Sequence, residues 1–131
     1  MVIAIDGPAG AGKSTVARAL AKRLGATYLD SGAMYRSVAL LTVRGGLDPD
    51  DPDVVVPLAA AIDVGMEGRA ITIGAEDVST AIRTPDVTAA ASRVSVHPGV
   101  REAMVARQRE LLCDGAWVAE GRDIGTVVYP E

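Results

Sequence analysis

The sequence has few aromatic residues, a single cysteine and fewer positive than negative charges. With one Trp, three Tyr and no Phe, its core must be built from Val, Ile, Leu and Ala, and an aromatic platform for stacking nucleic-acid bases is disfavoured. Cys113 has no second cysteine to pair with, and the first apolar run ends at Asp6, too early for a signal peptide or a membrane span. The formal net charge of −4 disfavours a nucleic-acid polymer or an anionic membrane as a partner. We therefore expect a soluble protein of a reducing cytoplasm.

The sequence does contain an alternation of strand-like and helix-like segments over 131 residues, about the length of one domain. Short apolar runs of the kind buried on both faces of a parallel sheet alternate with segments of helical period. The first helix carries Val16, Leu20 and Leu24 on its apolar face, with Ala17 and Ala21 beside them. The expected strands are 2–5, 27–29 and 117–119, with a short extended piece at 127–128, and the expected helices are 14–24 and one that is capped by Asp30 or Ser31 and ends by Gly45-Gly46.

The middle of the chain departs from this pattern. An acidic turn at 48–53 precedes an expected helix at 54–62, which Pro57 fits poorly, and alternating residues at 62–66 and 71–73 predict an antiparallel hairpin that turns at Gly68-Arg69. Two more helices are expected at 85–94 and 98–112, because each begins with proline.

These elements predict one α/β domain with a parallel core sheet. Its core would comprise residues 1–46 and 113–131, and a subdomain of about residues 47–112, containing the hairpin and helices, would be inserted into it. So few parallel strands, with no helix after the last, lead us to expect the N-terminal part of a longer protein.

The strongest motif is a P-loop, G-x-x-x-x-G-K-[ST], which lies between an expected strand and an expected helix and so indicates a three-layer P-loop fold. Its glycines let backbone N–H groups turn toward anionic oxygens, and the following helix presents its positive end to the same phosphates. Lys13 is expected to reach the β- and γ-phosphates, and Ser14 to bind Mg²⁺. The expected nucleotide-binding residues are Gly7, Pro8, Ala9, Gly10, Ala11, Gly12, Lys13, Ser14 and Thr15. Because P-loops serve ATPases, GTPases and kinases, the loop alone does not define the reaction.

Three further sequence blocks indicate which class of P-loop protein this is. They are Leu29-Asp30-Ser31-Gly32-Ala33-Met34-Tyr35-Arg36, Ile82-Arg83-Thr84 and Glu120-Gly121-Arg122-Asp123-Ile124-Gly125-Thr126-Val127-Val128. Together with the P-loop, and in order along nearly the whole chain, they closely resemble the bacterial cytidylate kinase family. The resemblance implies phosphorylation of CMP or dCMP, with ATP as co-substrate and Mg²⁺ as the metal, in pyrimidine nucleotide metabolism. It also implies that the inserted subdomain binds the monophosphate.

A nucleoside monophosphate carries a dianionic phosphate, which guanidinium groups bind in bidentate fashion. Arg36, on the second helix beside Ser31, and Arg122, after the third strand, should approach the carboxyl ends of the strands, where ligands bind in open parallel sheets. Either could instead be a solvated surface arginine. Glu120 ends its strand where a Mg²⁺-binding carboxylate of a P-loop fold belongs, although it could also be a helix cap or a partner of Arg122.

Cytosine offers a donor at N4 and acceptors at N3 and O2. The resemblance places Asp123 and Ser92 on the amine and Arg101 on the acceptor side. Ser92 could instead be a helix-surface hydroxyl, and Arg101 could pair with a glutamate of its own helix. His97 is interpreted as a loop or capping residue, and the acidic turn as solvated rather than a calcium site, because it lacks an EF-hand's glycine and terminal glutamate.

We expect phosphoryl transfer by a monomer through positioning and charge stabilisation, with Lys13, Arg36 and Arg122 as the catalytic residues and no covalent intermediate. The lid that the family closes over ATP is not among these residues, so binding without efficient turnover is one alternative. Another P-loop kinase of a small molecule or nucleoside monophosphate is a second. A switch-like GTP- or ATP-binding module is a third, and its guanine-selective form is disfavoured because the chain has no Asn, which the usual guanine-specifying motif requires.

The first testable prediction concerns base selectivity. Asp123→Ala should weaken CMP binding more than UMP binding, because only cytosine offers this carboxylate a donor. Calorimetric titration of both nucleotides measures the difference, with Arg101→Ala titrated in parallel. An equal loss for both would contradict the role of Asp123.

Overall fold

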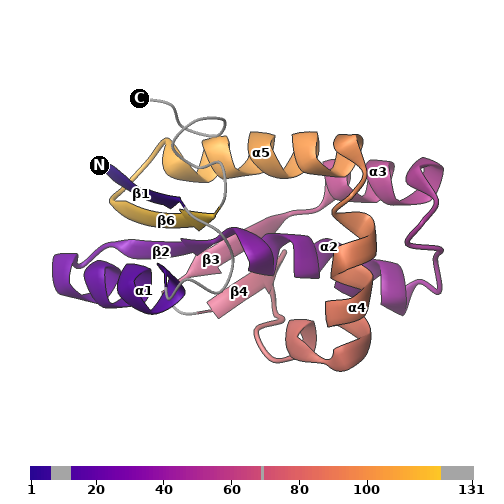
Figure 1. Cartoon of the computed structure of the whole chain (residues 1–131), viewed down its shortest axis with the longest axis horizontal. Helices are drawn as coiled ribbons and strands as arrows, with labels where there is room; N and C mark the ends of the chain where they lie inside the picture. The colour runs from indigo at the N-terminus through magenta and orange to yellow at the C-terminus, as the bar shows by residue number, and fades with distance from the viewer. Residues whose placement is uncertain (7–12, 69, 122–131) are drawn as a thin grey trace.

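A parallel sheet with helices on both faces forms one end of the molecule (Figure 1). The computed structural model describes residues 1–6, 13–68 and 70–121. The strands are β1 (Val2–Asp6), β2 (Thr27–Asp30), β3 (Val64–Glu67), β4 (Ala70–Ile73), β5 (Glu76–Asp77) and β6 (Trp117–Gly121). The helices are α1 (Lys13–Leu24), α2 (Ser31–Arg44), α3 (Pro52–Ala61), α4 (Pro85–Val94) and α5 (Pro98–Leu112), with a 3₁₀ turn, η1 (Ala81–Arg83). The expected α/β class and the strands and helices within the described ranges are thus confirmed, whereas the piece at 127–128 lies outside them.

β6, the last strand of the described residues, is the central strand of the parallel sheet. The order is β1-β6-β2, and β6 pairs in parallel with both neighbours. Successive side chains of a strand point to opposite faces. Accordingly, Ala119 packs with Leu29 and with Leu112 of α5, whereas Val118 packs with Ala17 of α1 on the other face. The sheet is therefore the middle layer of three, as expected.

The buried face of α1 differs from the expected one. Ala17 and Ala21 are buried, whereas Val16 and Leu24 are 59% and 46% exposed. The two alanines lie one helical turn apart and let the helix approach Val118 closely, so the contact centres on the small residues. The prediction of Val16 and Leu24 as core residues is wrong.

A small antiparallel sheet, β3-β4-β5, follows the third helix. The expected hairpin is confirmed, with Met66 opposite Ile71 and Gly68 in the left-handed conformation, φ +59°, at its turn. The two-residue β5 and the turn η1 were not expected, because segments this short show no periodicity. Pro57 lies within α3 at an exposed position, so the helix continues past it.

The largest apolar cluster lies beside the parallel sheet rather than on it. It joins Met34 and Val38 of α2 to Val55 of α3, Val94 of α4 and Met104 of α5. Consequently α2, which begins at the end of β2, packs into the same core as the helices of the expected inserted subdomain. None of the helices in the described ranges has the length and apolarity needed to cross a membrane.

The close approach of α3 and α5 depends on Gly99. A Cβ at this position would lie 2.8 Å from Cγ1 and 2.9 Å from Cγ2 of Val56. Since real Cβ atoms do not approach other atoms this closely and a β-branched side chain moves little in a helix, one helix would have to shift.

Gly99→Ala should therefore destabilise the protein by about 1–3 kcal/mol, the usual cost of overpacking. Denaturant unfolding measures the change. Glu102→Ala, at an exposed position of the same helix, is the control and should stay within about 0.5 kcal/mol of the wild type. A stable Gly99→Ala variant would show that the two helices have room to separate.

Candidate phosphate-binding site

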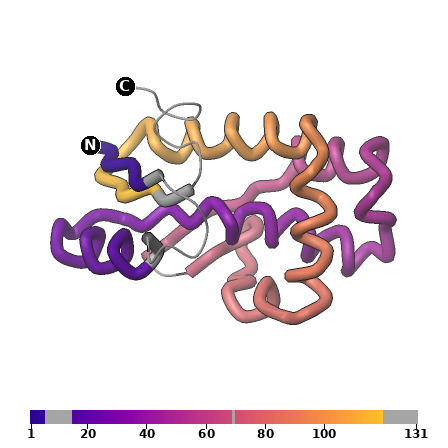
Figure 2. The backbone as a smooth tube through the Cα atoms, viewed as in Figure 1, coloured from indigo at the N-terminus to yellow at the C-terminus, as the bar shows by residue number. Residues whose placement is uncertain are grey.

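The carboxyl ends of the three parallel strands lie side by side and form one edge of the sheet, the carboxyl edge. Glu120 of β6 is in register with Ile5 of β1 and with Asp30 of β2. α2 begins directly after β2, and α1 runs back along the sheet from this edge (Figure 2). Two helix N-termini, each with unpaired N–H groups and the positive end of a helix dipole, therefore face the carboxyl edge. Such an arrangement favours phosphate groups.

Asp30 fixes the start of α2. Its Oδ1 accepts a hydrogen bond from the N–H of Ala33 at 3.1 Å, with extended backbone at Asp30. Its Oδ2 lies 3.8 Å from Nη2 of Arg18, whose guanidinium is 5.2 Å from the ring centre of Tyr28. Of the two candidate caps, the structure selects Asp30. The link to Arg18 was missed, because nothing in the sequence pairs residues of two different elements.

Arg36 lies on the next turn of α2 and is half-buried. A Cβ on Gly32 would lie 3.5 Å from Nη1 of Arg36 and 3.3 Å from Oδ1 of Asp30. The guanidinium of Arg36 therefore folds back toward Gly32 in the first turn of α2. Within the described ranges, no hydrogen bond or ion pair engages the Arg36 side chain. A half-buried cation without a partner at a helix N-terminus is well placed for an anion. Ser31, the first residue of α2, is half-buried as well.

Ser92 and Arg101 lie on α4 and α5. Ser92 is in the last turn of α4 and Arg101 in the first turn of α5, and both residues are exposed. The backbone carbonyl of Ser92 accepts a hydrogen bond from Oγ of Ser95 at 3.2 Å. Ser31 and Arg36 thus lie in the first two turns of α2, and Ser92 and Arg101 lie on either side of the α4–α5 junction.

The structure describes only some of the remaining expected site residues. Gly7 to Gly12, Arg122 and Asp123 lie outside the described residues, as do the side chains of Lys13, Ser14 and Glu120. For the last three the backbone alone is placed, in the first turn of α1 and at the end of β6. Thr15 is exposed in the first turn of α1.

The acidic turn has a structural role. Oδ1 of Asp48 accepts the N–H of Asp50 at 2.9 Å, and the carboxylate of Asp50 forms a bidentate pair with Arg93, which lowers the pKa of Asp50. His97 at the start of α5 donates from Nε2 to the carbonyl of Pro49, 2.9 Å away. Across the described residues, no cluster of His, Cys, Asp or Glu is arranged to hold a metal ion.

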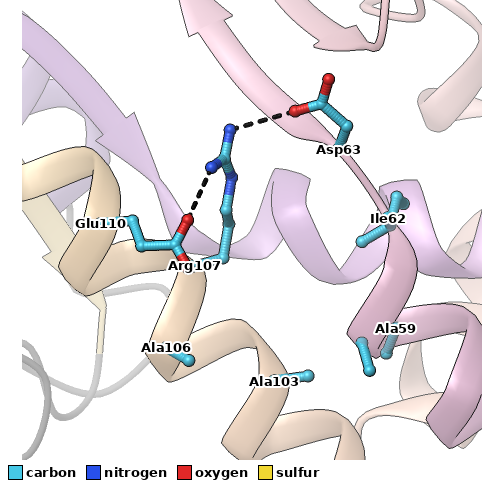
Figure 3. A pocket seen from close by; sticks show the side chains of 8 residues that line it. Ala59, Ile62, Asp63, Ala103, Ala106, Arg107 and Glu110 are labelled. Atoms are coloured by element: carbon cyan, nitrogen blue, oxygen red, sulfur yellow. Dashed lines mark hydrogen bonds and ion pairs between the residues drawn. The ribbon is translucent and has the colours of Figure 1, made fainter.

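A hollow of about 300 Å³ lies between α3 and α5 (Figure 3). Arg107 stands at its rim, where it pairs with Asp63 at 3.2 Å and Glu110 at 2.9 Å and donates from Nε to the carbonyl of Val64 at 2.8 Å. Of the expected site residues that the structure describes, none lines this hollow. Its lining residues are Ala59, Ala60, Ile62, Asp63, Ala103, Ala106, Arg107 and Glu110.

Comparisons with a family model and with curated relatives all identify cytidylate kinases. The family model described as cytidylate kinase matches residues 3–131. A cytidylate kinase of Solibacter usitatus is 54% identical over all of this chain, which spans 56% of that relative. A bifunctional pantoate ligase/cytidylate kinase of Synechococcus sp. (strain CC9902) is 51% identical over 98% of this chain and 28% of the relative. The protein of the same name from Synechococcus elongatus is 50% identical over 99% of this chain and 26% of the relative. The chain thus spans about half the length of the first relative and about a quarter of the bifunctional ones.

The contribution of the Ala33–Asp30 hydrogen bond to stability can be measured separately from the contribution of the charge of Asp30. Asp30→Ala should cost about 1 kcal/mol of stability, because the first turn of α2 loses its cap, whereas Asp30→Asn should cost only a few tenths, because Asn caps as well as Asp. Thermal or denaturant unfolding of both variants measures this. Equal losses would show that the charge near Arg18, rather than the cap, stabilises this corner.

Proposed function

The chain belongs to the cytidylate kinase family, and we propose that it transfers the γ-phosphoryl group of ATP to the 5′-phosphate of CMP or dCMP. The observation that carries the proposal is the half-buried guanidinium of Arg36, which lies by the first turn of α2 without a partner among the described residues. Relatives named as cytidylate kinases support it. We propose that the protein acts as a cytoplasmic monomer in pyrimidine nucleotide metabolism.

The donor side of the proposed reaction is the P-loop. The motif runs from Gly7, directly after β1, to Ser14, and its last two residues, Lys13 and Ser14, are the first two of α1. Triphosphate oxygens bound there would face the positive end of α1. The ammonium group of Lys13 would offset negative charge on the β- and γ-phosphates.

The acceptor side is the start of α2. Arg36 would bind the 5′-phosphate of CMP, assisted by Ser31 and by Arg122. Because α1 and α2 both begin at the carboxyl edge, the two phosphates would lie between two positive helix ends. The attacking phosphate oxygen is already anionic near neutral pH, so no strong general base is needed. Alignment and charge stabilisation then account for catalysis.

The residues present suit Mg²⁺. This ion prefers oxygen ligands, and it is usually held by few protein groups together with substrate phosphates. Ser14 in the first turn of α1 supplies a hydroxyl, and Glu120 supplies a carboxylate on the central strand, in register with Ile5 at the carboxyl edge. Ser14 and Glu120 would hold the ion, which when bound would neutralise charge on the phosphates.

Base recognition would involve the α4–α5 junction. Ser92 and Arg101 are both exposed there, and α5 extends beyond the strand ends (Figure 1). A hydroxyl and a guanidinium suit the N4 amine and the ring acceptors of cytosine, respectively, with Asp123 as the second acceptor for the amine. Uracil would present an oxygen to Asp123, which is a physical reason for selectivity.

The role of Arg36 can be tested directly. Arg36→Ala should weaken CMP binding about tenfold to a hundredfold, the value of charge-assisted hydrogen bonds to phosphate, and should leave ATP binding and stability nearly unchanged. Arg36→Lys should recover part of the affinity, because an ammonium group keeps the charge but not the bidentate fork. Calorimetry with CMP, UMP, AMP and ATP measures these values.

The matched control is Arg93→Ala, which removes an exposed arginine of α4 that pairs with Asp50. It should retain CMP affinity. Undiminished CMP binding by Arg36→Ala would argue against the proposed acceptor site, and tighter binding of UMP or AMP than of CMP would favour another nucleoside monophosphate kinase activity.

A further inference from the structure

The guanidinium of Arg36 has a carboxylate as its neighbour. A Cβ on Gly32 would lie 3.5 Å from Nη1 of Arg36 and 3.3 Å from Oδ1 of Asp30, so both groups lie beside the same point at the start of α2. Asp30 caps α2, and the side chain of Arg36 points back along the helix toward it, as long helical side chains do. No hydrogen bond or ion pair nevertheless joins the two groups in the described part of the chain. The surroundings of Asp30 therefore keep these opposite charges apart.

Both carboxylate oxygens of Asp30 are engaged by other groups. Oδ1 accepts the hydrogen bond from the N–H of Ala33 at 3.1 Å, and Oδ2 faces Nη2 of Arg18 at 3.8 Å. The side chain of Asp30 is only 13% exposed, so solvent and salt screen its charge less than that of a surface carboxylate. The ion pair with Arg18 is therefore the interaction that offsets the charge of Asp30 from another element.

The position of Arg18 is set by α1 and β2. Its neighbour in the sequence, Ala17, is fully buried against the sheet, which fixes the rotation of α1. The guanidinium of Arg18 lies 5.2 Å from the centre of the Tyr28 ring, within the range of a cation–π interaction. Tyr28 and Asp30 are two residues apart on β2 and so share one face of the strand. Arg18 meets both residues along that face.

Without Arg18, the carboxylate of Asp30 would have Arg36 as its neighbouring cation. Arginine binds carboxylate and phosphate through the same fork of N–H donors. A pair between Asp30 and Arg36 would therefore compete with a phosphate for the donors of Arg36, and phosphate binding would first have to break it. Because both residues belong to the start of α2, forming such a pair requires only side-chain rotation.

We propose that Arg18 is a positioning residue of the monophosphate site: by pairing with Asp30, it keeps this carboxylate from Arg36 and leaves the guanidinium of Arg36 free for the phosphate of CMP. This inference rests on the proposed function, in which Arg36 binds that phosphate. Arg18 acts through Asp30 and does not touch the nucleotide. The contact between α1 and the end of β2 thus serves substrate binding as well as packing.

The main test is Arg18→Met, because Met keeps an apolar contact with the Tyr28 ring and removes the charge. We expect a CMP affinity about fivefold lower than that of the wild type, measured by calorimetry, which is the effect of a partly exposed ion pair that the phosphate must displace. Arg18→Lys should retain most of the affinity, because an ammonium group keeps the positive charge beside Asp30.

The matched control is Lys22→Met, which removes the same charge from an exposed position one turn further along α1. It should leave CMP affinity within about twofold, because salt screens an exposed charge that lies further away. An Arg18→Met variant that binds CMP as tightly as the wild type overturns the inference. An equal loss in Lys22→Met also overturns it, because the loss would then come from the net charge of α1.

A double-mutant cycle with Asp30 separates this role from a direct attraction between Arg18 and the phosphate. Asp30→Asn retains the cap of α2 and removes the negative charge, so it should bind CMP at least as tightly as the wild type. In this background Arg18→Met should change CMP affinity by less than about twofold, because no carboxylate is left to engage Arg36. A loss as large as in the single variant would show that Arg18 attracts the phosphate or supports the fold, and it would overturn the inference.

The variants at Arg36 and Arg18 distinguish a failure of the proposed function from a failure of this inference. A wild-type protein that binds ATP but no CMP, or an Arg36→Ala variant with undiminished CMP binding, overturns the proposed acceptor site and this inference with it. If Arg36→Ala loses CMP affinity and Arg18→Met does not, the inference alone is overturned.

Discussion

The pairing of β6 with both β1 and β2 is the constraint on which the rest of the structure depends. Hydrogen bonding on both sides of this strand brings Ile5, Glu120 and Asp30 into one register, although they lie far apart in the sequence. Parallel strands in register end at a common edge, and the helices that follow β1 and β2 must begin there. The same pairing that buries Val118 and Ala119 therefore brings two helix N-termini to one place, where phosphate groups are favoured.

Small residues allow helices to approach their neighbours at several points. Ala17 and Ala21 let α1 lie close on the sheet, and Gly99 lets α5 approach Val56 of α3. At Gly32 the tightest neighbour of an added Cβ would be Oδ1 of Asp30, at 3.3 Å, so this glycine gives room to the oxygen that caps α2. Packing density and site geometry thus depend on the same property, a missing or minimal side chain.

Exposed ion pairs connect α2 and α4 to the segments next to them. Arg44 of α2 pairs with Glu76 of β5 and lowers the pKa of that carboxyl, and Arg93 of α4 does the same for Asp50 in the acidic turn. A carboxyl whose pKa is lowered by folding stabilises the protein above its ordinary pKa near 4, and this contribution is lost as the pH falls through the lowered value. Because these pairs are exposed, they orient elements more than they stabilise them.

The sequence by itself determined the order and type of most elements, because periodicity, proline at helix starts and glycine turns act locally. It also determined the P-loop and the family, since both are contiguous patterns. Tertiary structure alone decided that Asp30 rather than Ser31 caps α2, that Ala17 rather than Val16 is buried, and that Arg18 meets Asp30. It likewise left Arg36 without a partner in the described residues and buried the amide of Gln108. The cap is a local hydrogen bond, from Ala33 to Asp30, for which the sequence offered two adjacent candidates. The other features depend on contacts between segments distant in the chain, because burial and polar partners belong to the assembled core rather than to any local pattern.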